Sequence, residues 1–177
     1  MDLRNMRLQE GILLEKTQLA VGITGISKGV GTTFVSHQLD YILNKKEARK
    51  LFVSSPDRYR ITDEPDEFEF QDILVAVIDP LPSKLMEGAD RIRELIEGPV
   101  PVVWLVNRDN AGVNRRSMQK YLCFSPQFSQ EEVPREIICR AEYNCIELSE
   151  IYRLEGMEKL AGHIREKGSW QGQPKSV

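Results

Sequence analysis

A glycine-rich segment at residues 25–33 stands between an apolar run and a helical pattern. The apolar run, residues 19–24, has the length and composition of a buried parallel strand. After the segment, apolar side chains recur at helical spacings, at Phe34, Val35, Leu39, Ile42 and Leu43. Glycines let backbone N–H groups converge, and a helix N-terminus adds partial positive charge. The segment therefore predicts a strand, a loop and a helix that together can hold a phosphate group.

The segment also follows the spacing of the phosphate-loop motif G-x-x-x-x-G-K-S/T. In that motif the lysine reaches the outer phosphates and the next hydroxyl holds Mg²⁺. Counted back from Gly31, the frame covers residues 26–33, so Thr32 stands in the position of the lysine and Thr33 retains the hydroxyl. Lys28 lies inside the loop and could supply part of the missing charge. The alternative is a tight strand-to-helix connection without a ligand.

Composition places the chain among single-domain proteins. Its 177 residues are 41% hydrophobic, which allows a sizeable core without disulfide or metal staples. A net charge of −3 with scattered basic residues gives no direct nucleic-acid signature. The three cysteines have no C-x-x-C spacing, and no signal peptide or long apolar run is evident, so we expect a cytoplasmic protein. We expect an N-terminal extension at 1–18, one domain at 19–167 and a flexible tail at 168–177.

Strand and helix patterns alternate along the rest of the chain. We expect further strands at residues 51–53, 73–78, 101–107 and 133–140. Residues 56–70 are acidic and contain two prolines, so we expect a connection there. We expect helices ending near Leu122 and spanning residues 155–167. A further helix should bury one face, made of Leu85, Ala89, Ile92 and Ile96. The alternation predicts an α/β fold with a mostly parallel sheet and helices on both faces.

Four segments, taken in order, resemble the ParA/MinD-type (SIMIBI) P-loop ATPases. The first is residues 27–33, similar to the family loop K-G-G-x-G-K-S/T, with Ser27 and Thr32 in the positions of its two lysines. The second is residues 77–83, similar to I-D-T-P-P-S, in which the acid corresponds to Asp79. The third and fourth are the V-N-R triplet at 106–108 and the I-P-R-like strand at 133–142. The resemblance covers roughly residues 19–167 and implies a three-layer P-loop NTPase-like fold.

The resemblance also implies ATP and Mg²⁺ as ligands, with a site residue for each part of the nucleotide. Phosphates would lie on Ser27, Lys28, Gly29, Val30, Gly31, Thr32 and Thr33. Magnesium would lie near Thr33 and Asp79, and adenine near Asn107 and Pro134. From the residues alone, Thr33 could instead cap a helix, Asp79 a loop, and Asn107 could form a turn. No catalytic residue is assigned.

The chain departs from the family pattern in other places besides Thr32. The family's second strand ends in a D-x-D-P segment. The corresponding residues of this chain, 54–57, begin with Ser54 and Ser55. We therefore expect the carboxylates of that segment to be missing or displaced. The stretch from Asp79 to Asn107 is short for the family, which predicts the loss of one strand–helix unit. Within the family, the chain most resembles degenerate, TadZ-like members.

The favoured hypothesis is an ATP-binding regulatory or positioning protein with weak or no hydrolysis, because Thr32 replaces the lysine. One alternative is a slow ATPase completed by a partner or a second subunit. Another is a scaffold for protein interactions that has kept the fold and binds no nucleotide. A protein partner or a homodimer fits each of these. Membrane association through residues 1–18 is disfavoured, since acidic side chains dilute the basic face that such a helix needs.

Overall fold

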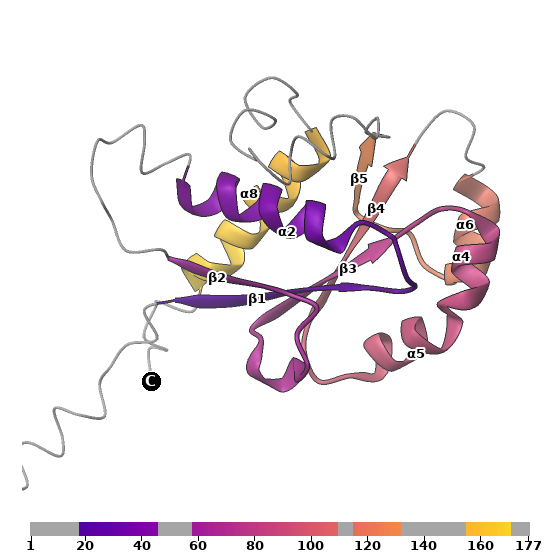
Figure 1. The fold of residues 1–177 in the computed structure, drawn as a ribbon, viewed down its shortest axis with the longest axis horizontal. Helices are drawn as coiled ribbons and strands as arrows, with labels where there is room; N and C mark the ends of the chain where they lie inside the picture. Colours follow the sequence, from indigo (N-terminus) through magenta and orange to yellow (C-terminus); the bar gives the residue numbers. More distant parts are fainter. Residues whose placement is uncertain (1–17, 46–57, 110–114, 132–154, 171–177) are drawn as a thin grey trace, which may run out of the picture.

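Five parallel strands form one sheet in the computed structural model, which describes residues 18–45, 58–109, 115–131 and 155–170 (Figure 1). The strands are β1 (Leu19–Gly25), β2 (Tyr59–Asp63), β3 (Ile73–Ile78), β4 (Val102–Asp109) and β5 (Phe128–Glu131). Their order across the sheet is β2-β1-β3-β4-β5. The chain therefore passes from β1 to β2 on one side of it, and then from β2 to β3 on its other side. Such a reversal opens a crevice at the carboxyl ends of parallel strands.

Helices cover both faces of this sheet. They are α2 (Thr32–Asp40), which continues as a π-helical turn (Tyr41–Lys45), α4 (Pro82–Glu87), α5 (Ala89–Glu97), α6 (Arg115–Leu122) and α8 (Glu155–Trp170). Figure 1 shows α2 and α8 together on one side of the sheet, and α4, α5 and α6 on the other. The predicted three-layer α/β fold with a parallel sheet is thus confirmed.

The core lies on both faces of the central strands. Every residue of β3 is buried, which explains why its sequence is an uninterrupted apolar run rather than an alternating one. The predicted apolar face of the last helix is also buried, at Met157, Leu160, Ala161 and Ile164. Between β3 and β4 the chain forms only α4 and α5, and the two strands pair directly.

The second strand lies inside the segment that we expected to be a connection. β2 pairs with β1 from Tyr59 to Asp63, whereas residues 51–53 lie outside the described residues. β2 is an edge strand whose side chains are only half-buried or exposed, so its apolar signal is weak. Its start is held by Asn44, which donates to the carbonyl of Tyr59 at 2.8 Å and accepts from its N–H at 3.1 Å.

The helix expected around residues 85–96 is divided in two at Gly88. A Cβ atom at Gly88 would lie 2.6 Å from the carbonyl oxygen of Ile26, so the backbone approaches the glycine loop closely there. The predicted buried face was wrong at two positions. Ala89 and Ile96 are exposed, and Leu95 is buried instead.

Two other boundaries differ from the expected ones. β5 ends at Glu131, before the segment 133–140 that we expected to be a strand, and that segment lies outside the described residues. Helix α8 extends to Trp170 and so includes the start of the expected tail. The expected N-terminal extension and residues 171–177 are outside the description, apart from Gln18. Among the described helices, none has the length and apolar character needed to cross a membrane.

The phase of α5 can be tested with two neighbouring substitutions. Leu95 is 3% exposed and Ile96 is 56% exposed. Leu95→Ala should lower the free energy of unfolding by about 2–5 kcal/mol, because it leaves a cavity in the core. Ile96→Ala, the matched control, should change it by less than about 0.5 kcal/mol. Urea unfolding measures both, and a larger effect at Ile96 would contradict the structure.

Candidate functional site

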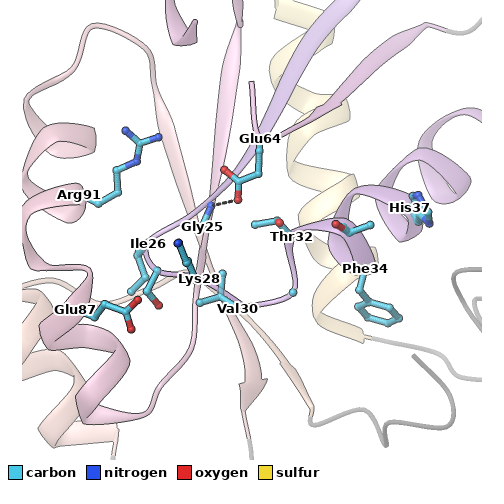
Figure 2. Close-up of a pocket in the computed structure, with 14 residues that line it drawn as sticks. Gly25, Ile26, Lys28, Val30, Thr32, Phe34, His37, Glu64, Glu87 and Arg91 are labelled. Atoms are coloured by element: carbon cyan, nitrogen blue, oxygen red, sulfur yellow. Dashed lines mark hydrogen bonds between the residues drawn. The ribbon is translucent and has the colours of Figure 1, made fainter. Parts of the chain in front are cut away.

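A cleft of about 740 Å³ opens at the carboxyl end of β1, where the strand order reverses. Residues 25–34 form most of its lining, and His37, Glu64, Glu87 and Arg91 complete it (Figure 2). All seven loop residues predicted to hold phosphates line this cleft, whereas Asp79 and Asn107 do not. The volume lies within the range of pockets that hold small ligands. The structure therefore places the glycine loop at the wall of a ligand-sized cleft.

Two glycines give the loop its shape. Gly29 and Gly31 have φ of 74° and 93°, in the left-handed region that disfavours residues with a side chain. Gly31 also precedes α2, where its carbonyl accepts from the N–H of Val35 at 3.1 Å. A Cβ atom at Gly31 would lie 2.5 Å from Nδ2 of Asn107. Gly31 is therefore required by both its backbone conformation and its neighbour.

Asn107, on β4, holds the loop through a buried hydrogen bond. It is 4% exposed, and its Nδ2 donates to the carbonyl of Val30 at 2.7 Å. Its Oδ1 accepts from Nε2 of Gln130 at 2.8 Å and from the N–H of Arg108 at 3.0 Å. The carboxamide thus joins the loop to β4 and β5. Its contact with adenine stays a prediction, and Pro134 lies outside the described residues.

The loop retains features of an anion site despite Thr32. Oγ of Ser27 is buried and has no hydrogen-bond partner among the residues that the structure describes. At Gly29 the position of a Cβ atom has nothing within 4 Å, so the space above the loop is open. The side chain of Lys28 is exposed at the same place. An unpaired donor, open space and a cation fit a phosphate group.

The predicted magnesium pair is not joined directly. Oγ1 of Thr33 donates to Oδ2 of Asp63 at 2.8 Å. The carboxylate of Asp79 is buried, where Oδ1 accepts from the N–H of Leu81 at 3.0 Å and Oδ2 pairs with Arg108 at 3.1 Å. Thr33 therefore meets the end of β2, and Asp79 fixes the start of α4.

Two carboxylates that we did not predict lie beside the loop, at the end of β2. Besides Asp63, Glu64 accepts from the N–H of Gly25 at 3.0 Å and from Oγ1 of Thr24 at 3.2 Å. Glu64 has φ of 45°, an uncommon conformation for a residue with a side chain. The second strand therefore ends in two acidic residues, whereas we expected that strand to end at residues 54–57, which lie outside the described residues. In the sequence, the only trace of these two carboxylates is the short acidic segment Thr-Asp-Glu-Pro at residues 62–65.

These carboxylates do not form a complete metal cage. Within the described ranges, no group of three His, Cys, Asp or Glu side chains is arranged to hold a metal ion. Mg²⁺ is commonly held by one or two carboxylates together with substrate phosphates and water. Beside the cleft, Thr33 and Asp63 provide a hydroxyl and a carboxylate oxygen within 2.8 Å of each other, which are donors of the type that Mg²⁺ uses.

Basic side chains of α4 and α5 also contact the loop and the end of β1, and no sequence motif predicts them. Nζ of Lys84 donates to the carbonyl of Lys28 at 2.9 Å and to Glu87 at 3.0 Å. The hydrogen bond from Lys84 is the main reason why the pKa of Glu87 is lowered. Arg91 donates to Oγ1 of Thr24 at 3.3 Å. Positive charge therefore approaches the loop from the helices that follow β3.

Known structures share this fold at low sequence identity. The ParA family ATPase from Chlorobium tepidum TLS is 10% identical with a TM-score of 0.59, over 85% of this chain and 100% of that chain. The MinD cell division protein of Aquifex aeolicus is 12% identical with a TM-score of 0.62, over 90% and 99%. The chain has a ParA/MinD-type P-loop fold. A chain of the MinC:MinD cell division protein complex of Aquifex aeolicus has the same ParA/MinD-type fold. It is 12% identical with a TM-score of 0.60, over 90% of this chain and 98% of that chain.

No protein-family model and no curated protein matches the sequence. At 10–12% identity, the similarity to the solved structures concerns the ParA/MinD-type fold alone. What the cleft binds therefore has to be argued from its own residues.

The two loop glycines should differ in their tolerance of a side chain. Gly29→Ala should cost about 1–2 kcal/mol of stability, the penalty of a left-handed backbone in open space. Gly31→Ala should cost about 1–3 kcal/mol more, because its Cβ displaces Asn107 from a buried hydrogen bond. Urea unfolding of both variants checks the difference. Equal losses would contradict the contact between Gly31 and Asn107.

Proposed function

We propose that the protein binds ATP with Mg²⁺ in this cleft and acts as a regulatory or positioning protein with little or no hydrolysis. The observation that carries the proposal is the loop itself, whose left-handed glycines line an open, ligand-sized cleft, and in which the buried hydroxyl of Ser27 has no hydrogen-bond partner among the described residues. Thr32 stands where the motif has its lysine. The loop is thus a cradle for phosphates without the usual cation.

The two functions of such a loop respond differently to the loss of the lysine. Each hydrogen bond from the cradle to a charged phosphate contributes roughly 1.5–3 kcal/mol, and these donors do not depend on residue 32. Losing a group that stabilises charge developing in the transition state typically lowers a rate by about 10²-fold or more. Binding should therefore survive where turnover does not.

The remaining parts of the nucleotide would be held by residues around the loop. Thr33 would take the magnesium ion, with Asp63 beside it at 2.8 Å and Asp79 as the family-derived alternative. Asn107 and Pro134 would lie near adenine. Asn107 would need to exchange at least one of its present hydrogen bonds for such a contact.

The protein would act through its conformation and through contacts with a partner protein or a second copy of the chain, in the cytoplasm. The MinC:MinD complex supports this only by analogy of fold. A TadZ-like role within the family is a narrower form of the same proposal, and it rests on the altered loop.

A slow ATPase is the second candidate, and a specific observation favours it. Asp63 and Glu64 bring carboxylates to the loop, which could orient water or a metal ion. Their presence removes one of the reasons for expecting an inactive site. The two candidates differ in turnover but agree on the ligand.

Calorimetry and phosphate release together test the proposal. We expect the wild-type protein to bind ATP with Mg²⁺ and to show a higher thermal midpoint with ATP than without it, because a ligand of the native state stabilises that state. Phosphate release should stay at the level of an Asp63→Asn control. Release that is clearly above this control would favour the slow ATPase. If millimolar ATP gave no heat and no midpoint shift, that result would contradict both candidates and favour the scaffold.

A further inference from the structure

The cleft receives a guanidinium group at the point where the loop begins. We propose that Arg91 supplies the phosphate-binding positive charge that the motif normally obtains from the lysine at the position of Thr32. The proposal rests on the proposed function, and its ligand class is the polyphosphate group of a nucleotide. Arg91 belongs to α5, so the charge would come from a different element and from the opposite side of the cleft to α2 (Figure 2).

The break between α4 and α5 places Arg91 there. Gly88 lies against the loop, since a Cβ atom on it would be 2.6 Å from the carbonyl oxygen of Ile26. Gly88 also begins the new helix, because its carbonyl accepts from the N–H of Ile92 at 2.9 Å. The first turn of α5 therefore starts in contact with the loop, and Arg91 lies on that turn.

The guanidinium is held in a defined position. It donates to Oγ1 of Thr24 at 3.3 Å, at the end of β1. Its central carbon lies 4.4 Å from the centre of the Phe68 ring, a cation–π contact. Its side chain is 32% exposed, so it remains accessible from the cleft that it lines. A partly buried, oriented cation loses less freedom on binding a ligand than a mobile one.

The present ion pair of Arg91 can be exchanged for a phosphate. Arg91 pairs with Glu94 at 2.6 Å, but the Glu94 side chain is 60% exposed, and exposed pairs are weak. A guanidinium binds phosphate through two parallel hydrogen bonds, which is a stronger and more directional contact. Oγ1 of Thr24 also donates to Glu64, so Arg91 stands next to the carboxylate that now occupies the N–H of Gly25.

The other basic side chains near the loop are less suited to this role. Nζ of Lys84 supports the loop from outside the lining, through the carbonyl of Lys28 and through Glu87. Lys28 lines the cleft, but its side chain is exposed, so its charge is screened by water. Arg91 is the basic residue of the lining that is both partly buried and fixed by neighbours from other elements.

Calorimetry with ATP and Mg²⁺ tests the role of Arg91. Arg91→Met keeps the aliphatic contact and removes the charge, and it should weaken ATP binding roughly 10- to 100-fold, as expected for one charge-assisted hydrogen bond. Arg91→Lys should recover part of the loss. Adenosine, which has no phosphate, should bind all variants alike. The matched control is Arg93→Met, on the same helix, whose side chain is 66% exposed and pairs with Asp90. It should bind ATP as the wild type does.

The outcomes separate this inference from the proposed function. Wild-type and Arg91→Met proteins that bind ATP equally would overturn the role of Arg91 and leave the proposed function standing. A wild type that binds no nucleotide would overturn both. An equal loss in Arg91→Met and Arg93→Met would also overturn it, because only general charge would then matter. The thermal midpoint without ligand shows whether each variant folds, and Arg91→Gln replaces Arg91→Met if the latter does not.

Discussion

The shape of the loop depends on the buried hydrogen bond from Asn107 to the carbonyl of Val30, at 2.7 Å. In a low-dielectric interior such a bond is strong, and losing one partner leaves the other unpaired at a cost. The same carboxamide accepts from Gln130 on β5, and it leaves room only for a glycine at position 31. One side chain on β4 thus fixes the conformation that lets the loop act as a cradle, whatever residue stands at position 32.

Around this fixed loop, charge is distributed differently from the phosphate-loop motif. The motif concentrates its positive charge in the lysine that precedes the metal hydroxyl. Here the equivalent side chain is Thr32, and basic groups come from the helices after β3, with Lys84 bound to the loop and Arg91 lining the cleft beside the end of β1. Carboxylates arrive from the end of β2, at Asp63 and Glu64. The altered loop is therefore part of a rearranged site, which is why we favour binding over loss of the ligand.

The elements that could be predicted from sequence are those with strong local signals. The buried strand β3 and the apolar face of α8 were confirmed, because uninterrupted apolar runs and helical periodicity come from burial. The edge strand β2 was missed, since its side chains are half-buried or exposed and its end is acidic. Because the strand was missed, Glu64 was missed too. Its carboxylate lies beside the loop because β2 pairs with β1. Arg91 belongs to no motif, and only the break at Gly88 brings it to the cleft.

The central claim is that the loop at residues 25–33 binds the phosphates of a nucleotide. The most direct measurement is the amide ¹H–¹⁵N spectrum of the protein during titration with ATP and Mg²⁺. We predict that the largest shifts occur at Gly29, Gly31 and the amides around them, with smaller shifts at Asp63 and Glu64, because bound phosphate acts on the nearest N–H groups. Unchanged loop amides at saturating ATP, or shifts confined to other parts of the chain, would contradict this claim.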